Sequence, residues 1–199
     1  MPDALRLAVL LSGTGRTLQN LIDKISNGEL AATIVLVISN KDDAYGLTRA
    51  EAAGIPTAIV TKKDFPGPAF SERIFTLIRK SRADLVCMAG FLQLLHIPED
   101  FTGRVLNIHP ALLPDFGGQG MYGHHVHEAV LKSGAKESGC TVHIADNEYD
   151  RGTIFVQKRV PVLEGDTPET LAERVFAAEC EAYPEAIKKW RFNHENTKR

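Results

Sequence analysis

Short apolar runs alternate with helical segments along this chain, and the alternation constrains its fold more than any other feature. The runs have the length of buried strands: 5–11, 33–38, 57–60, 85–88 and 105–108. The segments at 18–25, 45–53 and 69–80 separate the first four runs and are predicted to be helices. Strands that alternate with helices form parallel sheets covered on both faces. The sequence therefore predicts an α/β fold with a doubly wound, mostly parallel sheet and helices on both faces.

The carboxyl-terminal part departs from this rhythm. Segments 140–144 and 153–160 alternate apolar and polar residues, with an acidic loop between them, which predicts an antiparallel pair at an edge of the sheet. Thr167 and Pro168 are the cap and first residue of a long helix that is expected to run to about Lys189. We expect one domain over 1–191 and a polar, frayed tail over 192–199.

Composition excludes several classes of function. The 199 residues are 44% hydrophobic, which is enough for one sizeable core, and the formal net charge of -2 provides no basic field for nucleic acid. No run approaches the length of a membrane span, and the amino terminus does not resemble a leader segment. Cys87, Cys140 and Cys180 are odd in number and far apart, which favours thiols in a reducing compartment. We expect a cytoplasmic protein.

A possible catalytic pair stands at the end of the fifth run. Asn107 and His109 precede Pro110, and residues two apart in a strand project from the same face. An amide and an imidazole side by side at a strand end suit catalysis in a cleft. A structural interpretation also fits, in which both side chains cap the next segment and satisfy their own hydrogen bonds.

A glycine turn at 12–17 follows the first run and opens a helix. Gly15 allows close approach of the backbone, the amides at a helix start attract anions, and Arg16 and Thr17 add donors. The spacing does not match the dinucleotide fingerprint, and simple turn chemistry without a ligand is the alternative. Ligands of such sheets bind beyond the carboxyl ends of the strands, so Gly15, Gly90 and Asn107 are expected to converge on one crevice.

Asp150 lies in the acidic loop between the two alternating segments. If those strands pair, its carboxylate can reach His109, orient the imidazole and favour its protonated form. A solvated acidic turn is the alternative.

Three histidines, His124, His125 and His127, follow a glycine-rich loop at 117–123. They lack the spacing of a helical zinc site, so we predict no metal and interpret them as polar residues that line a cleft wall.

With these residues in view, the chain resembles the phosphoribosylglycinamide formyltransferases, folate-dependent enzymes of purine synthesis, along nearly its whole length. Four blocks carry the resemblance in order and spacing: 12–15 with 18–19; 39–41 with 43–44 and 46–47; 89–91 ahead of 106–110; and 142–143 ahead of Asp150. The resemblance implies a Rossmann-like formyltransferase fold. Related tRNA formyltransferases and formyltetrahydrofolate hydrolases carry an additional domain, for which 199 residues leave no room.

The resemblance also implies roles for particular residues. Gly15, Arg16 and Thr17 would hold the substrate phosphate, and Glu179 would contact the glycinamide ribonucleotide. The folate pterin would be bound largely by main-chain groups of Leu92, Gln93, Leu94 and Leu95, together with Asn107. Three features depart from the family: Gly67 stands where a folate-binding arginine is frequent, Gln93 replaces another common arginine, and the loop 117–123 is longer than in many relatives.

The expected reaction is direct transfer of a formyl group from 10-formyltetrahydrofolate to the amino group of 5'-phosphoribosylglycinamide. Asn107 and protonated His109 would stabilise the oxyanion, and Asp150 would hold His109 and a relay water. The alternatives are transfer to another amine, such as that of a sugar nucleotide, and a non-catalytic nucleotide-binding module. The expected partners are small molecules only, with neither nucleic acid nor membrane, in a monomer or weak homodimer.

Overall fold

The computed structural model describes residues 4–197, and the chain divides into two compact units between Leu106 and Asn107. The first unit contains four strands, β1 (Leu5–Leu11), β2 (Ala32–Ser39), β3 (Thr57–Ile59) and β4 (Leu85–Met88). Their order is β3-β2-β1-β4, and each neighbouring pair is parallel. The predicted parallel arrangement is therefore confirmed in this unit.

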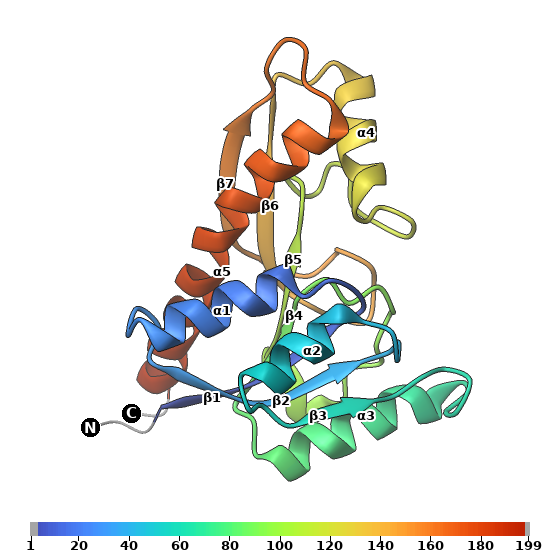
Figure 1. The fold of residues 1–199 in the computed structure, drawn as a ribbon, viewed down its shortest axis with the longest axis vertical. Helices are drawn as coiled ribbons and strands as arrows, with labels where there is room; N and C mark the ends of the chain where they lie inside the picture. The colour runs from blue at the N-terminus through green and yellow to red at the C-terminus, as the bar shows by residue number, and fades with distance from the viewer. Residues whose placement is uncertain (1–3, 198–199) are drawn as a thin grey trace. The chain divides into compact units, whose positions relative to one another are not determined.

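Helices cover both faces of the sheet in the first unit. Helices α1 (Arg16–Ser26) and α2 (Tyr45–Ala52) lie on one face, and α3 (Pro68–Ser81) lies on the other (Figure 1). A short 3-10 turn, η1, spans Glu99–Phe101. Residues 7–11 of β1 are completely buried because the strand is covered on both sides.

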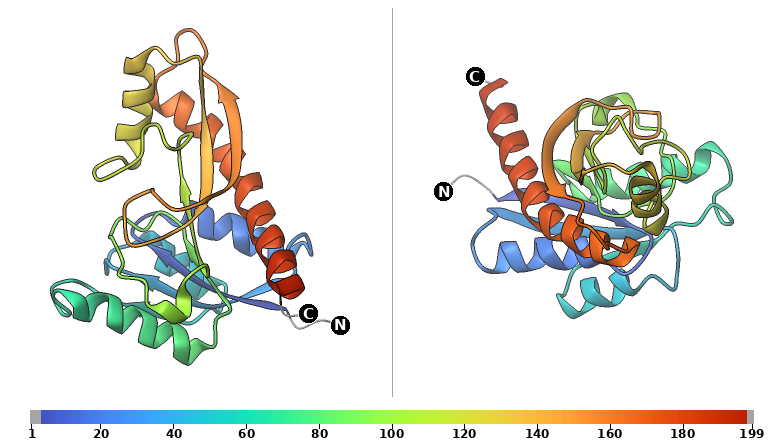
Figure 2. Two further views of the ribbon diagram at one scale, coloured as in Figure 1. Left: turned by 180° about the vertical axis from the view of Figure 1, so that it is seen from behind. Right: turned by 90° about the horizontal axis from the view of Figure 1, so that it is seen from above.

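The second unit has a different organisation. Strand β5 (Val105–His109) contributes its last three residues to this unit, and the order there is β5-β6-β7. Strands β6 (Glu137–Ile144) and β7 (Ile154–Pro161) are antiparallel, as predicted. Helix α4 (His124–Ser133) packs against the long helix α5 (Pro168–Thr197), which also packs along β6 and β7 (Figure 2). The α/β fold class with an antiparallel carboxyl-terminal pair is thus confirmed.

The end of α5 includes most of the predicted tail. Residues 192–197 are helical, residues 198–199 lie outside the described part of the chain, and the tail over 192–199 stays a prediction. Two interactions at helical spacing extend the last turns: Arg191 forms an ion pair with Glu195 at 2.7 Å, and the rings of Trp190 and His194 stack with centroids 4.6 Å apart. The assignment of 1–191 to a single domain stays a prediction. In the part of the chain that the structure describes, no helix is long and apolar enough to cross a membrane.

Candidate active site

The end of β5 carries the two residues predicted to form a catalytic pair. Asn107 and His109 share a face of the strand, because side chains alternate along it, and the strand's apolar residues are buried. Asn107 is half-buried, and His109 is only 3% exposed. The apolar run therefore delivers two polar groups to a largely water-excluded position.

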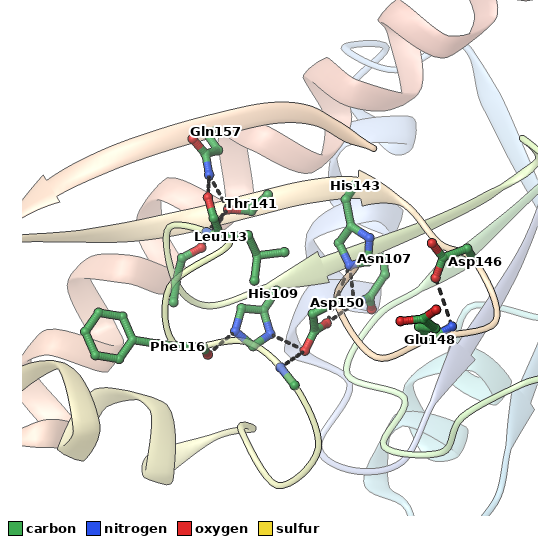
Figure 3. Close-up of polar contacts among 12 residues, drawn as sticks. Asn107, His109, Leu113, Phe116, Thr141, His143, Asp146, Glu148, Asp150 and Gln157 are labelled. Carbon is green, nitrogen blue, oxygen red and sulfur yellow. Dashed lines mark hydrogen bonds and ion pairs between the residues drawn. The ribbon is translucent and has the colours of Figure 1, made fainter. Parts of the chain in front are cut away.

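The loop between β6 and β7 brings Asp150 to this pair (Figure 3). Its Oδ2 lies 3.5 Å from His109 Nδ1, and its Oδ1 accepts a hydrogen bond from Asn107 Nδ2 at 3.3 Å. All three predicted catalytic residues belong to the second unit, and the structure brings them together there.

The glycine-rich loop after β5 also contacts Asp150. The amide of Gly118 donates to Asp150 Oδ2 at 3.0 Å, and a Cβ on Gly117 would lie 3.2 Å from the Asp150 Cβ and 2.5 Å from Leu113 Cδ2. Asp150 itself has a φ of 54°, in the left-handed region that few non-glycine residues adopt. Close packing against the loop thus accompanies an unusual backbone conformation at Asp150, and the Gly118 amide orients its carboxylate.

A fourth residue of the cluster, His143, was not predicted as a site residue. Its Nε2 lies 2.9 Å from Asn107 Nδ2 and 3.5 Å from Asp150 Oδ1 (Figure 3). The amide nitrogen carries two hydrogens, so Asn107 can donate one to Asp150 and the other to His143. His143 is 1% exposed, and its position among the residues shared with the formyltransferases was the only signal in the sequence.

Hydrogen bonding identifies one proton on His109. Its Nε2 lies 2.8 Å from the carbonyl oxygen of Phe116, and because a carbonyl only accepts, Nε2 is protonated. The opposite nitrogen, Nδ1, faces Asp150. Phe116 has a φ of 56°, so the loop around the imidazole contains a second residue in the left-handed region.

The pKa values of the cluster follow from burial and from neighbouring charges. Burial lowers the pKa of His109, and Asp150 and the Phe116 carbonyl offset this only in part. Burial acts in the opposite direction on Asp150, but His143, His109 and the Gly118 amide outweigh it and lower the Asp150 pKa below its usual range. Asp150 is therefore ionised near neutral pH. The protonated imidazole expected for His109 would need a raised pKa, whereas burial lowers the pKa of His109.

The predicted phosphate turn lies in the first unit. Helix α1 begins at Arg16, and its N-cap, Gly15, has a φ of 71° and no side-chain hydrogen bond to the helix. The first turn of α1 contains no acidic residue, Arg16 is exposed and Thr17 is half-buried. A helix start without a side-chain cap presents amides that suit an anion.

The predicted folate segment lies beside that turn. The amide of Leu92 donates to Ser12 Oγ at 2.9 Å, and the amide of Ser12 donates to the Gly90 carbonyl at 3.0 Å. Leu92 and Leu94 are each 38% exposed, whereas Gln93 is half-buried and Leu95 is buried. The ends of β1 and β4 therefore meet at one edge of the first unit. The convergence of Asn107 on the same crevice stays a prediction.

Glu179 lies on α5 in the second unit and is 9% exposed. Its carboxylate is close enough to Cys140 to raise the pKa of that thiol, which burial and Glu179 together bring to about 12. The assignment of Glu179 to the ribonucleotide stays a prediction.

The three histidines considered as metal ligands lie in the first turns of α4. His124 and His125 approach Glu128 at 3.2 Å and 3.7 Å, whereas His127 is buried. Over residues 4–197 no group of three or more His, Cys, Asp or Glu side chains is arranged to hold a metal ion.

The parallel unit with its glycine turn, and the Asn107–His109–Asp150 cluster in the second unit, are the features that the resemblance to formyltransferases predicted. Comparison with family models gives the same class, because residues 5–187 match the formyl transferase family. The chain belongs to this family.

Relatives of known name narrow the comparison. The chain is 44% identical over 187 residues to a trifunctional purine biosynthetic protein adenosine-3 of Drosophila pseudoobscura pseudoobscura, covering 92% of this chain and 13% of that protein. It is 42% identical to the chloroplastic phosphoribosylglycinamide formyltransferase of Arabidopsis thaliana, covering 94% of this chain and 65% of the relative. The chain therefore spans less than two thirds of either relative.

Among solved structures, glycinamide ribonucleotide transformylase 1 from Symbiobacterium toebii is similar over most of both chains. The TM-score is 0.87 at 39% identity, and the match covers 94% of this chain and 87% of that one. The phosphoribosylglycinamide formyltransferase from Brucella melitensis has a TM-score of 0.85 at 41% identity, with coverage of 94% and 95%.

Proposed function

We propose that this protein transfers the formyl group of 10-formyltetrahydrofolate to the amino group of 5'-phosphoribosylglycinamide. The observation that carries the proposal is the position of the Asp150 carboxylate against Asn107, His109 and His143. A non-catalytic nucleotide-binding module would have no need for this buried cluster. The names of the relatives favour the glycinamide ribonucleotide over other amines.

The proposed chemistry is a direct displacement at the formyl carbon. The substrate amine first adds to that carbon, and the C=O electron pair moves to the oxygen, which gives a tetrahedral intermediate. The C=O bond then re-forms as the bond to the folate nitrogen breaks, and a proton moves from the attacking nitrogen to the leaving one. In the intermediate the formyl oxygen carries negative charge. Asn107 Nδ2 and His109 Nε2 are the proposed donors to that oxygen. With substrate bound, the oxygen would replace one present acceptor of the Asn107 amide, Asp150 or His143, and would replace the Phe116 carbonyl as the acceptor of Nε2. Loss of a single such donor costs about 10²–10³ in rate.

Asp150 has two parts in this proposal. It faces Nδ1 of His109, so it favours the imidazolium as negative charge develops on the substrate and offsets part of the lowering of the His109 pKa by burial. It also orients the water that relays the proton, and general acid–base help of this kind contributes about 10²–10⁴ in rate.

The two substrates are assigned to residues at the edge of the first unit and to Glu179. The amides at Gly15, Arg16 and Thr17 suit the phosphate, because that helix start has no side-chain cap. The exposed side chains of Leu92 and Leu94 and the backbone of residues 92–95 suit a flat heterocycle such as the pterin. Asn107 is assigned to both the folate and the reacting carbonyl, and no metal has a role in this proposal.

The proposed setting is the cytoplasm, with small molecules as partners and a monomer or weak homodimer as the working form. The three cysteines are thiols, which fits a reducing compartment.

The test is formyl transfer by the purified chain, with formation of the formylated ribonucleotide followed by mass spectrometry. We expect product with 5'-phosphoribosylglycinamide and none with a sugar-nucleotide amine. No product from the ribonucleotide at saturating folate would exclude the proposed substrate.

Variants in one loop separate catalysis from folding. Asp150→Asn should lower turnover severely, whereas Asp146→Asn should not. Asp146 lies in the same loop, and its Oδ1 accepts a local hydrogen bond from the Glu148 amide at 2.9 Å (Figure 3). Equal rates for the two variants would contradict the role given to Asp150.

A further inference from the structure

Helix α2 is attached to the glycine turn through the carbonyl groups of that turn. The amide of Gly46 donates to the Gly13 carbonyl at 3.0 Å, and Arg49 Nε donates to the Thr14 carbonyl at 2.9 Å. Two successive peptide groups of the turn are therefore held by the same helix.

The guanidinium of Arg49 is itself fixed on other sides. Its Nη1 donates to Gln19 Oε1 at 3.1 Å, and its Cζ lies 5.0 Å from the centre of the Tyr45 ring. Gln19 donates its own amide to Asp23 at 2.9 Å, which orients Oε1 toward the arginine. Arg49 thus joins the turn to the first part of α1.

The turn and α2 are also in close backbone contact. A Cβ on Gly15 would lie 2.6 Å from the Cα of Gly46 and 3.4 Å from Cδ of Arg49. Gly15 has a φ of 71°, so both its conformation and its space require glycine. The position of the turn is therefore set by α2.

Because the peptide bond is planar, the direction of each held carbonyl also sets the direction of the N–H that follows it. In a trans peptide the C=O and the following N–H point in opposite directions. A Gly13 carbonyl held toward α2 directs the Thr14 N–H away from α2, and a Thr14 carbonyl held there does the same for the Gly15 N–H. Rotation of the second peptide would instead present an oxygen to the anion.

We propose that Arg49 is a positioning residue for the substrate phosphate: by holding the Thr14 carbonyl, it aims the Gly15 amide at the phosphate without touching it. This inference rests on the proposed function, in which the turn binds the phosphate. The site would then comprise α2 as well as the turn and the start of α1.

A second explanation is that Arg49 contributes only its positive charge. Arg49→Lys keeps the charge but replaces the planar donor group, whereas Arg49→Met removes both. If geometry is what matters, the two variants are impaired alike. If charge is what matters, the lysine variant binds phosphate as the wild type does.

Arg104 provides a matched control in the same unit. Its Nε donates to the Asp84 carbonyl at 2.9 Å, its Nη2 donates to the Ala83 carbonyl at 3.0 Å, and its Cζ lies 4.7 Å from the Phe101 ring. Arg104→Met therefore removes the same kinds of contact away from the glycine turn.

The experiment is titration of the full chain with inorganic phosphate, followed through the ¹⁵N–¹H resonances of residues 13–17. In the wild type we expect saturable shifts of the Thr14 and Gly15 amides. Loss of a charged hydrogen bond that orients the amide should weaken phosphate binding about tenfold in both Arg49 variants. Binding by the Arg104 variant should be unchanged.

Steady-state kinetics give the second readout. The Arg49 variants should raise KM for the ribonucleotide about tenfold and leave KM for the folate unchanged. On a riboside that lacks the phosphate, the variants and the wild type should have the same kcat/KM. Two results would overturn this inference but leave the turn as the phosphate site: the Arg49 variants bind phosphate as tightly as the wild type, or Arg49→Lys alone restores full binding. Failure of the wild type to bind phosphate through these amides would overturn the assignment of the turn as well.

Discussion

The buried hydroxyl of Thr141 supports the segment that follows His109, and its removal gives a quantitative test. Thr141 is fully buried on β6, and its Oγ1 donates to the Ala111 carbonyl at 2.7 Å. The same oxygen accepts hydrogen bonds from the Leu113 amide and from Gln157 Nε2, both at 3.0 Å (Figure 3). Gln157 also donates to the Leu113 carbonyl at 2.8 Å.

Thr141→Val keeps the shape of the side chain and removes the hydroxyl. The Leu113 amide and the Ala111 carbonyl then lose their partner inside the protein, whereas Gln157 still bonds to Leu113. A buried polar group left without a partner costs about 1–3 kcal/mol, so two such groups should lower the free energy of unfolding by about 2–6 kcal/mol. The protein should remain folded, because domains of this kind have about 5–15 kcal/mol of stability.

Ser138 on the same strand is the matched control. It is 2% exposed, and among the residues described its Oγ has no hydrogen-bond partner. Ser138→Ala removes a polar group that gains nothing from burial, so its effect should lie within about 0.5 kcal/mol of zero or be stabilising.

Urea unfolding followed by the fluorescence of Trp190 measures both effects. Trp190 is the one tryptophan of the sequence, it is 5% exposed, and it lies in the same unit as Thr141. If Thr141→Val costs no more than Ser138→Ala, the hydroxyl does not support this segment and the reasoning is wrong. Turnover should fall with stability in the valine variant only, because residues 111–113 follow His109 directly.

Three further changes have defined outcomes. Asp150→Asn should reduce kcat by about 10²–10⁴, and the variant should fold because asparagine tolerates the left-handed conformation at this position; a rate within fivefold of wild type would contradict its role. Gly152→Ala should lower the free energy of unfolding in urea by more than about 4 kcal/mol, because a Cβ would lie 1.7 Å from the Ile144 carbonyl oxygen. A Cβ on Gly165 would have no atom within 4 Å, so Gly165→Ala should cost only about 1–2 kcal/mol for its left-handed φ. Equal costs for the two variants would exclude the steric explanation. Burial lowers the pKa of His127, so below pH 6.5 the unfolded state binds more protons than the folded state. The free energy of unfolding should therefore rise with pH up to about 6.5, by at most about 1.4 kcal/mol per pH unit. His127→Leu should reduce the slope of the urea midpoint against pH, and an unchanged slope would contradict the lowered pKa.

The strands of the first unit were predictable because each is a continuous apolar run that ends at polar or glycine residues. Leu5–Leu11 and Leu85–Met88 have the predicted limits. The start of β6 was less predictable: the strand begins at Glu137, where Glu137, Ser138 and Gly139 lack apolar alternation. Pairing with β7 extends the strand there, since Glu137 is in register with Pro161. Such an extension depends on tertiary pairing rather than on local pattern.

The geometry of the candidate site was predictable to the extent that its residues stand at strand ends. Asn107 and His109 are marked by polarity after an apolar run, and Asp150 by an acidic loop. His143 resembles an ordinary polar position in a half-buried strand, and Arg49 resembles an ordinary helix residue. Their contacts join residues far apart in sequence, such as Arg49 with Thr14 and His143 with Asn107. Chain folding determines those pairs, and no local spacing encodes them.

The Asp150 carboxylate links Asn107, His109 and His143 to the glycine-rich loop. Oδ1 faces Asn107 and His143, whereas Oδ2 faces Gly118 and His109. A carboxylate offers about four lone-pair positions. The Asn107 and Gly118 hydrogen bonds use two of them, and His109 and His143 each lie 3.5 Å from one of the two oxygens. The Gly118 amide and the His109 imidazole both face Oδ2. An increase of positive charge on His109 would therefore strengthen its attraction to the oxygen that accepts the Gly118 hydrogen bond. Order in the loop and the charge state of the imidazole are therefore expected to be coupled through Oδ2.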